Sequence, residues 1–472
     1  MNKYKYLAKN MVLFLMSGLF VNVVSFFLLP LYTYFLTTEE YAIIDLVTVT
    51  QQLLFPFLTL SLCDAVLRFA IESVEEKDKL GKVFSIGFSI SIFSSVIVLF
   101  FSNILKVIFG TEFNIKYFVI IFILTTFNSF FSNFIRAINK VRVMAMVSGI
   151  GNILTIVLNV FFIVRLHWGL DGYMTAYIIG QIFILMGYIL FGHIFLYVRL
   201  GSIDRNLLAK MLKYSVPLVP NALFWWINSS LDKYFLRTLM TFGVVGLYSV
   251  ASKIPAIIVS INGIFQQAWN LSAFKEFNNK ETGLFYNRIF QIYQFCLFVV
   301  SIALIASTHI LAKLLFSKDF YEAWIFVPWL IWGAGINAMN AFWGSMFTAA
   351  KDTRILFTTT GMGAVVNIVL NYILIKGFGA TGAAVATLVS YVVVWVVRER
   401  HIQKIVSINI DWRKYILIQG CILIQILFTL TEKTNAFLIG VIAEAIVVIL
   451  YRKQLLQIIV NVRNGYRKVK IR

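Results

Sequence analysis

Fourteen long apolar stretches follow one another along this chain, and they limit its possible folds more than any other feature. They lie at residues 10–36, 43–70, 83–103, 117–138, 143–165, 173–198, 214–236, 247–271, 289–309, 324–349, 355–375, 378–397, 415–430 and 436–451. A helix that spans a bilayer needs about 20 mainly apolar residues. Only 13% of the 472 residues are charged, about half the share found in a soluble domain. The sequence therefore predicts an all-α polytopic membrane protein with about 14 transmembrane helices, and it excludes a soluble enzyme and a secreted disulfide scaffold.

The basic residues are distributed unevenly among the loops. If the N-terminus lies in the cytoplasm, 31 of the 41 Lys and Arg residues fall in cytoplasmic segments and 9 in external ones. This excess is typical of the cytoplasmic side of membrane proteins. It explains the net charge of +20 without a nucleic-acid partner. We expect a multi-pass protein with both termini in the cytoplasm and a basic tail, residues 452–472, on the inner membrane surface.

The chain contains an internal repeat. The tetrapeptide Ile-Val-Leu-Asn occurs at 156–159 and again at 368–371, and Gly-Leu-Asp-Gly at 169–172 corresponds to Gly-Ala-Thr-Gly at 379–382. Earlier in each half, Tyr-Phe-Leu occurs at 34–36 and at 234–236. These matches keep one order, at offsets of 200 to 212. The repeat unit therefore contains six helices.

Two repeat units with an even number of helices have the same orientation in the membrane. We therefore expect two six-helix lobes, residues 1–200 and 201–400, related by a pseudo-two-fold axis along the membrane normal. Residues 401–472 add two extra helices and the tail. Five of the six prolines fall in the first two spans of each lobe, namely Pro30, Pro56, Pro217, Pro220 and Pro255. Because proline bends helices, we expect bends at equivalent places, which suit the moving wall of a central cavity.

Residues that would indicate a metal, a cofactor or an enzyme active site are missing from the sequence. Cys63, Cys296 and Cys421 lie within apolar runs without the spacing of metal ligands, and the four histidines are scattered. The chain has no phosphate-binding Gly-x-x-x-x-Gly-Lys-Ser/Thr loop. We therefore expect no metal, no cofactor and no enzymatic activity.

Polar residues at bilayer depth are the candidates for substrate binding, because such residues usually line a cavity or a path. They are Lys253, Arg68, Asp64, Lys233, Asp232, Gln51, Gln52, Asn221 and Asn228. Asp64 and Arg68 are spaced to pair on one helical face, although Asp64 could simply neutralise Arg68. Lys253 has no acidic residue three or four positions away, and the repeat places Gln52 at a similar depth. Arg68 and Lys233 lie near helix ends and could also extend to the membrane surface.

The first 70 residues resemble a known family of membrane proteins. The residues that carry the similarity are Leu-Pro-Leu-Tyr-Thr at 29–33, Glu-Tyr-x-x-x-Asp-Leu at 40–46 and Asp-Ala-Val-Leu-Arg-Phe at 64–69. Leu-Asp-Lys-Tyr-Phe at 231–235 and Gln-Gln-Ala-Trp at 266–269 extend it into the second half. The sequence is similar to the bacterial polysaccharide-unit flippases, the Wzx-type branch of the multidrug/oligosaccharidyl-lipid/polysaccharide exporter superfamily.

This resemblance implies two lobes around a central cavity and transport by alternating access in the bacterial cytoplasmic membrane. The implied substrate is an oligosaccharide on polyprenyl pyrophosphate, moved from the inner to the outer leaflet for capsule, O-antigen or similar polysaccharides. Membrane lipids and other polysaccharide-assembly membrane proteins are the expected partners. Lys253, Arg68 and Lys233 would bind pyrophosphate, and the Gln and Asn side chains would bind sugar hydroxyls.

Two other functions stay open. A cation-coupled multidrug exporter of the same fold class would carry acidic groups deep in a lobe, whereas we expect the deepest charge here to be basic. A membrane glycan polymerase or transferase would usually carry its catalytic groups in a sizeable external loop, and the chain has no connection of that length.

Overall fold

The computed structural model describes residues 26, 28–109, 113–197, 204–276, 282–406, 408, 410–431 and 436–452, and this part of the chain is helical with no strands. By their internal contacts, these residues divide into two compact units. One unit is Phe35–Trp226, and the other combines the described residues up to Tyr34 with those from Ile227 onwards. The expected lobes, residues 1–200 and 201–400, remain a prediction.

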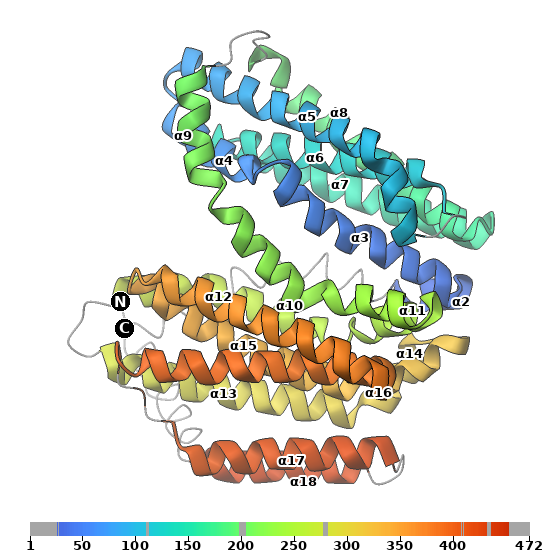
Figure 1. The fold of residues 1–472 in the computed structure, drawn as a ribbon, viewed down its shortest axis with the longest axis vertical. Helices are drawn as coiled ribbons and strands as arrows, with labels where there is room; N and C mark the ends of the chain where they lie inside the picture. The colour runs from blue at the N-terminus through green and yellow to red at the C-terminus, as the bar shows by residue number, and fades with distance from the viewer. Residues whose placement is uncertain are drawn as a thin grey trace, which may run out of the picture. The chain divides into compact units, whose positions relative to one another are not determined.

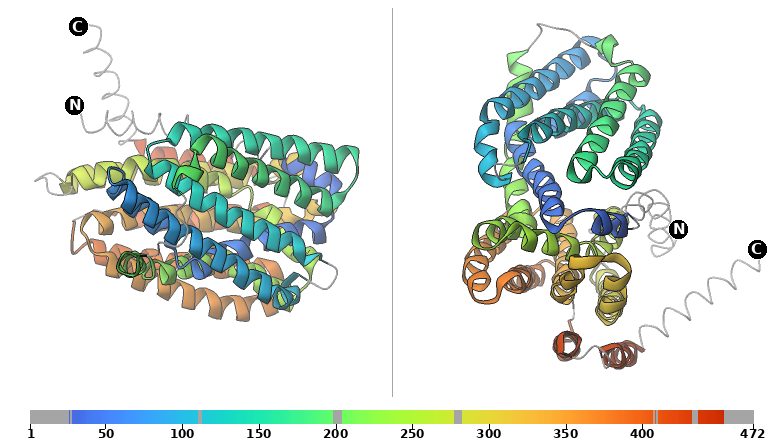
Figure 2. Two further views of the ribbon diagram at one scale, coloured as in Figure 1. Left: turned by 90° about the horizontal axis from the view of Figure 1, so that it is seen from above. Right: turned by 90° about the vertical axis from the view of Figure 1, so that its right-hand side faces the viewer.

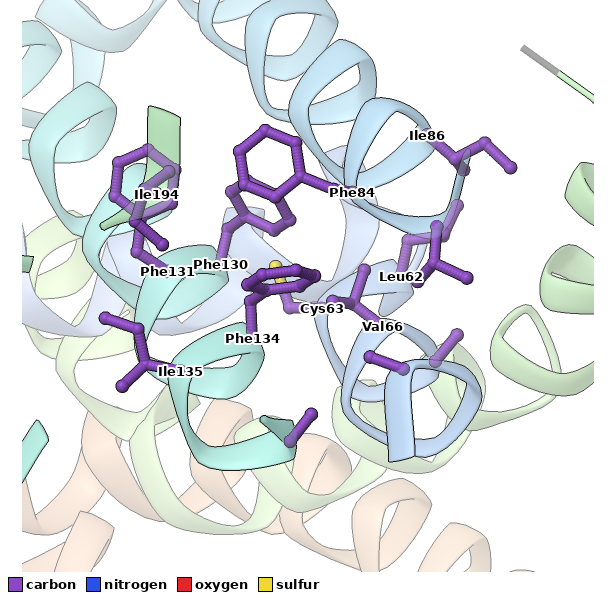
Figure 3. Packing of buried hydrophobic residues seen from close by; sticks show 14 of the residues in the cluster. Leu62, Cys63, Val66, Phe84, Ile86, Phe130, Phe131, Phe134, Ile135 and Ile194 are labelled. Atoms are coloured by element: carbon purple, nitrogen blue, oxygen red, sulfur yellow. The ribbon is translucent and has the colours of Figure 1, made fainter. Parts of the chain in front are cut away.

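The Phe35–Trp226 unit is a bundle in which α5 packs on α6 and α8 packs on both α6 and α7 (Figure 1). Its helices are α3 (Thr38–Leu58), α4 (Leu62–Glu72), α5 (Lys77–Phe109), α6 (Ile115–Ala137), α7 (Val141–Asn159), the π-helix η1 (Val160–Arg165), α8 (Gly169–Gly192), the 3-10 helix η2 (Ile194–Tyr197) and α9 (Arg205–Ser215). Figure 3 shows the core where α4, α5 and α6 meet. The Phe84 ring lies there with its centroid 5.1 Å from that of Phe130 and 5.0 Å from that of Phe134.

The second unit contains most of the remaining helices. They are α2 (Leu29–Phe35), α10 (Leu218–Leu239), α11 (Phe242–Ala251), α12 (Ala256–Glu276), α13 (Thr282–Ala306), α14 (Thr308–Leu315), the 3-10 helix η3 (Lys318–Ile325), α15 (Val327–Ala349), α16 (Thr353–Ile402), α17 (Trp412–Thr431) and α18 (Ala436–Leu450). The last residue of α2 and the first half of α10 belong to the other unit. Stacked rings of α12, α13 and α15 form its core, with Phe265 and Tyr293 centroids 4.3 Å apart and those of Trp269 and Phe342 4.6 Å apart.

The two helices beyond the repeat, α17 and α18, lie side by side (Figure 2) and pack on α13. Polar bonds fix them there: the Gln425 side chain donates to the Ile302 carbonyl over 2.9 Å, and the Tyr451 hydroxyl donates to Gln294 over 2.7 Å. Buried hydrogen bonds of this kind hold membrane helices together where apolar attraction between them is weak. The hairpin is therefore an integral part of its unit.

Each predicted span from the second to the fourteenth coincides with a helix or a pair of helices, while most of the first span and the tail 453–472 lie outside the described residues. In the described part, eight helices are long and apolar enough to cross a membrane, and two bent helix pairs could each form one more span. Apart from the first span, which lies mostly outside the described residues, this count is lower than the predicted one for three reasons. It takes α16 as one span, α10 carries polar and charged residues, and α18 has only 15 residues.

The long helix α16 contains the predicted eleventh and twelfth spans. Gly379 interrupts its helical backbone with φ 58° and ψ −141°, a conformation open mainly to glycine. At the matching position of the first half, Gly169 has φ 52° and begins α8. The offset of the repeat falls from 212 to 210 between the matched tetrapeptides and these glycines. The two additional residues of the first half lie near its π-helical turn η1, a common way to accommodate an insertion.

The repeat also appears in the turns and the side-chain bonds. Asn139 and Lys351, 212 residues apart, end equivalent helices with φ values of 61° and 60°. The Asn128 side chain on α6 donates to the Gln181 carbonyl on α8 over 3.0 Å, and the equivalent Asn340 on α15 donates to the Tyr391 carbonyl on α16 over the same distance. The sequence repeat is therefore a repeat of local structure.

The predicted breaks at proline are present in the second and eighth spans. Pro56 lies close to the end of α3, and the residues before α4 include Leu60 and Ser61, with φ values of 52° and 51°. Helices α11 and α12 meet at Pro255 with a bend of 48°. The second break follows from the hydrogen bond that proline cannot make, because Pro255 has no N–H for the carbonyl of Ala251, the last residue of α11.

Candidate functional site

A polar pocket of about 140 Å³ lies inside the second unit, between α10, α11, α12, α15 and α16. Its polar lining residues are Ser229, Asp232, Lys233, Tyr248, Ser252, Asn337, Thr387 and Tyr391. Small-molecule pockets usually measure about 300–1,000 Å³. This pocket therefore has room for an ion or one polar group of a larger molecule rather than for a whole oligosaccharide.

Asp232 is the acidic group of the pocket, and only 5% of its surface is exposed. The Tyr248 hydroxyl donates to Asp232 Oδ2 over 2.6 Å, and the backbone N–H of Lys233 donates to Oδ1 over 2.9 Å. Lys233, with 8% exposure, lines the same pocket. A carboxylate and an ammonium group thus share a small polar space at the depth of membrane helices.

The pocket holds an acidic group beside a basic one. Asp232 is as deeply buried as Lys233, whereas Lys253 is only half-buried. Asp232 and Lys233 are neighbours near the end of a predicted span, so their positions in the sequence do not indicate burial. Their burial depends on α11 and α16, which cover them.

Two further candidates lie in the same unit. Asn228 is buried one helical turn before Asp232, and its side chain donates to the Thr360 carbonyl on α16 over 3.1 Å. Lys253 lies in the break between α11 and α12, directly after Ser252 of the pocket lining. Both residues thus flank the pocket without lining it.

The remaining candidates belong to the Phe35–Trp226 unit. They are Gln51, which is half-buried, and Gln52, Asp64, Arg68 and Asn221, which are exposed. The predicted pairing of Asp64 with Arg68 is wrong in this structure. Arg68 Nε instead lies 3.4 Å from Glu72 Oε1, and the guanidinium carbon lies 4.6 Å from the centre of the Tyr214 ring. Because both partners are 55% exposed, this ion pair is screened by solvent.

Several pocket residues were not among the predicted site residues. Tyr248, Thr387 and Tyr391 bring hydroxyl groups from α11 and α16. A hydroxyl residue within an apolar span is too common to indicate a site by itself. Only the fold shows that these residues lie around the same pocket as Asp232.

The described residues contain no group of three or more His, Cys, Asp or Glu side chains that could hold a metal ion. The pocket contributes one carboxylate, one ammonium and several neutral oxygens. Chemically, such a set can exchange a proton, hold a small ion or donate hydrogen bonds to an anionic or hydroxylated group.

In its fold, the chain is similar to known membrane transporters. A family model described as "Polysaccharide biosynthesis protein" matches residues 7–270. The structure of the lipid II flippase MurJ in an inward closed conformation aligns with a TM-score of 0.68 at 17% identity, covering 94% of this chain and all of that chain. An inward-facing multidrug resistance MATE family transporter of the MOP superfamily aligns at 0.66 with 14% identity, covering 80% of this chain and 93% of that one.

A third structure, a point mutant of the Vibrio cholerae MATE transporter VcmN, aligns with a TM-score of 0.57 at 12% identity, covering 86% of this chain and 99% of that chain. No curated protein sequence matches the chain significantly. At these identities the structural likeness establishes the fold. The chain is a multi-pass helical membrane protein of the MOP-superfamily fold.

Proposed function

The chain belongs to the polysaccharide biosynthesis protein family, and we propose that it is a flippase for polyprenyl-pyrophosphate-linked oligosaccharides. It moves them from the inner to the outer leaflet of the bacterial cytoplasmic membrane by alternating access, with both termini in the cytoplasm. The observation that carries this proposal is the pair of buried charges, Asp232 and Lys233, in a hydroxyl-lined pocket within membrane helices. Charges at that depth are costly and mark substrate or ion pathways.

The chemistry of the substrate fits such a pathway. Sugars and pyrophosphate lose their hydration in hydrocarbon without compensation, so they need a polar route across the bilayer. The lipid tail can stay in the membrane while the head passes. We assign the pyrophosphate to Lys253, Lys233 and Arg68, and the sugar hydroxyls to Gln51, Gln52, Asn221 and Asn228. Asp232 and Asp64 complete the proposed site, and Asp232 accepts a proton or another cation during the cycle.

The direct test uses purified protein in liposomes that contain polyprenyl-pyrophosphate oligosaccharide on their inner leaflet. Transport is measured as exposure of the sugar to a membrane-impermeant glycosidase added outside. Wild-type protein should accelerate exposure, and Lys253→Ala should remove most of this acceleration while Lys253→Arg keeps part of it, because charge decides a point contact. Transport by Lys253→Ala at the wild-type rate, at equal protein level, would remove Lys253 from the site.

The second candidate function is cation-coupled multidrug export. Asp232 favours it, because a deeply buried carboxylate in a lobe is the feature that we expect of this class. The same liposomes, loaded with a fluorescent organic cation and given a proton gradient, distinguish the two functions. Dye movement without sugar exposure would replace the flippase proposal by drug export.

A further inference from the structure

Arg398, near the end of α16, is the most deeply buried cation in the described residues, with 4% of its surface exposed. The pattern of apolar spans places it in a cytoplasmic loop. In the described part of the chain its guanidinium makes no ion pair, and the neighbouring Glu399 side chain accepts from Gln403 instead. A buried charge without an opposite charge is costly unless its hydrogen bonds are satisfied. The acceptors around Arg398 therefore explain why it is tolerated.

Three neutral acceptors hold the guanidinium. Nε donates to Thr359 Oγ1 over 3.0 Å, Nη1 donates to the Asn340 carbonyl over 2.9 Å, and Nη2 donates to Thr360 Oγ1 over 2.9 Å. Thr359 and Thr360 lie in the part of α16 before Gly379, Asn340 lies in α15, and Arg398 lies after Gly379. The planar fork of arginine thus links three helical segments at once.

These bonds are part of a closed ring that reaches α10. Asn340 donates to the Tyr391 carbonyl, the Tyr391 hydroxyl donates to the Asn228 carbonyl over 3.0 Å, and the Asn228 side chain donates to the Thr360 carbonyl. Asn228 is therefore held on two sides by residues that Arg398 fixes directly or through Asn340. Because Asp232 follows one turn after Asn228, the ring also fixes the orientation of the acidic group in the pocket.

The first repeat fills the matching position without a charge. Tyr188 lies 210 residues before Arg398, is 3% exposed, and has its hydroxyl near the side chains of Ser132 and Ser148. Ser148 corresponds to Thr360, and Ser132 corresponds to Gly344. The same backbone can thus be packed with a neutral ring and two hydroxyl groups, so packing alone does not require a guanidinium in the second repeat.

We propose that Arg398 is a positioning residue, which holds α10 against α15 and α16 through the Asn228–Thr360–Asn340–Tyr391 ring and so sets the position of the Asp232 pocket. The guanidinium takes its acceptors from two segments and lies on a third, so it stabilises only the arrangement in which all three are in place. When α10 moves during transport, either the hydrogen bonds of the ring must break or the other residues of the ring must move with α10. The role in transport rests on the proposed function, whereas the position of α10 can be measured without any substrate.

The experiment gives the second repeat the residues that the first repeat has at the matching positions. The double variant Gly344→Ser/Arg398→Tyr places in the second repeat the serine and tyrosine that correspond to Ser132 and Tyr188. Position 344 has room for a side chain, because a Cβ at Gly344 would lie 3.7 Å from Leu356 and 3.8 Å from Arg398 Nη1. Ser229→Cys on α10, in a background without Cys63, Cys296 and Cys421, reports the position of the helix through its labelling rate with a membrane-impermeant maleimide. Tyr188→Phe in the first repeat is the matched control.

We expect the double variant to reach the wild-type protein level and to change the labelling rate by about two- to thirtyfold, the effect of a coupling of roughly 0.5–2 kcal/mol. Arg398→Lys keeps the charge but loses the fork, and it should change the rate in the same direction. Tyr188→Phe should leave the rate unchanged. A wild-type labelling rate in the double variant, or in Arg398→Lys if the double variant does not fold, overturns the proposal and makes Arg398 a packing residue.

Discussion

Two groups of helices follow the same backbone path but bury side chains of different polarity. One group is α6, α7 and α8 of the Phe35–Trp226 unit, and the other is α15 and α16 of the second unit. Each group ends a helix with a residue of positive φ, reverses direction at a glycine, and is tied by one asparagine side chain to a carbonyl. Inside the first group lies the neutral Tyr188, and inside the second lies the charged Arg398. The repeat thus encodes the path of the chain in both halves, while buried charge at this position appears in only one.

The two repeats also differ in charge at the pocket. Asp232 lies 200 residues after Tyr32, the offset of the matched Tyr-Phe-Leu tripeptides, so the first repeat has a phenol where the second has a carboxylate. A repeated fold lets one copy keep the scaffold while the other specialises. The comparison therefore predicts that polar substitutions in the second copy affect transport, whereas those in the first copy affect mainly stability.

The largest effect is expected from Asp232→Asn. The variant keeps a hydrogen-bond acceptor for Tyr248 but loses the charge. A hydrogen bond to a charged group contributes about 1.5–3 kcal/mol. If this contribution is lost from the rate-limiting step, transport slows by about 10- to 150-fold. Sugar exposure in liposomes at matched protein level measures it. Tyr32→Phe is the control at the matching position and should keep transport. Equal losses in both variants would contradict the specialisation of the second repeat.

The second prediction concerns the glycines after the two reversals. A Cβ at Gly382 would overlap the Leu374 carbonyl oxygen, whereas a Cβ at Gly172 would lie 3.0 Å from Trp168 Cβ. Because the overlap at Gly382 is the more severe, Gly382→Ala should lose up to about 3 kcal/mol of stability and Gly172→Ala about 1 kcal/mol. Thermal unfolding in detergent checks the difference. Equal unfolding temperatures would show that the second reversal relaxes without cost.

A smaller effect is expected for the bonds that the two copies share. Asn340→Ala removes one side-chain bond between membrane helices, and Asn128→Ala removes two, because Asn128 also donates to Gln181 Oε1 over 2.7 Å. About 0.6 kcal/mol is typical of each such bond, so both losses are small. Asn340 keeps its carbonyl for Arg398, so the ring loses one link and not two. The two variants should therefore unfold at similar temperatures. A much larger loss for Asn340→Ala would show that the ring acts as a cooperative unit.

Much of the fold could be predicted because its signals are local. Apolar length marks the helices, Pro56 and Pro255 mark the breaks, and the repeated glycines mark the reversals. The site depends on which helix faces which. Tyr248 reaches Asp232 from sixteen residues away, a relation that neither helical periodicity nor the repeat contains. Basic residues usually follow a span, which predicts a loop at Arg398, yet α16 continues past it to Ile402.

The smallest effect is expected at Arg68, where local spacing was ambiguous. Asp64 precedes Arg68 by four residues and Glu72 follows it by four, so helical geometry allows either pair. The structure pairs Arg68 with Glu72 at 3.4 Å, and Tyr214 on α9 lies against the guanidinium.

A double-mutant cycle on thermal stability decides between the two pairs. Arg68→Gln and Glu72→Gln should show weak coupling that disappears in high salt, because both groups are 55% exposed. Arg68→Gln and Asp64→Asn should be additive at every salt concentration. Measurable coupling of Asp64 with Arg68 would mean that the guanidinium changes partner during the cycle, and its pairing with Glu72 would then belong to only one state.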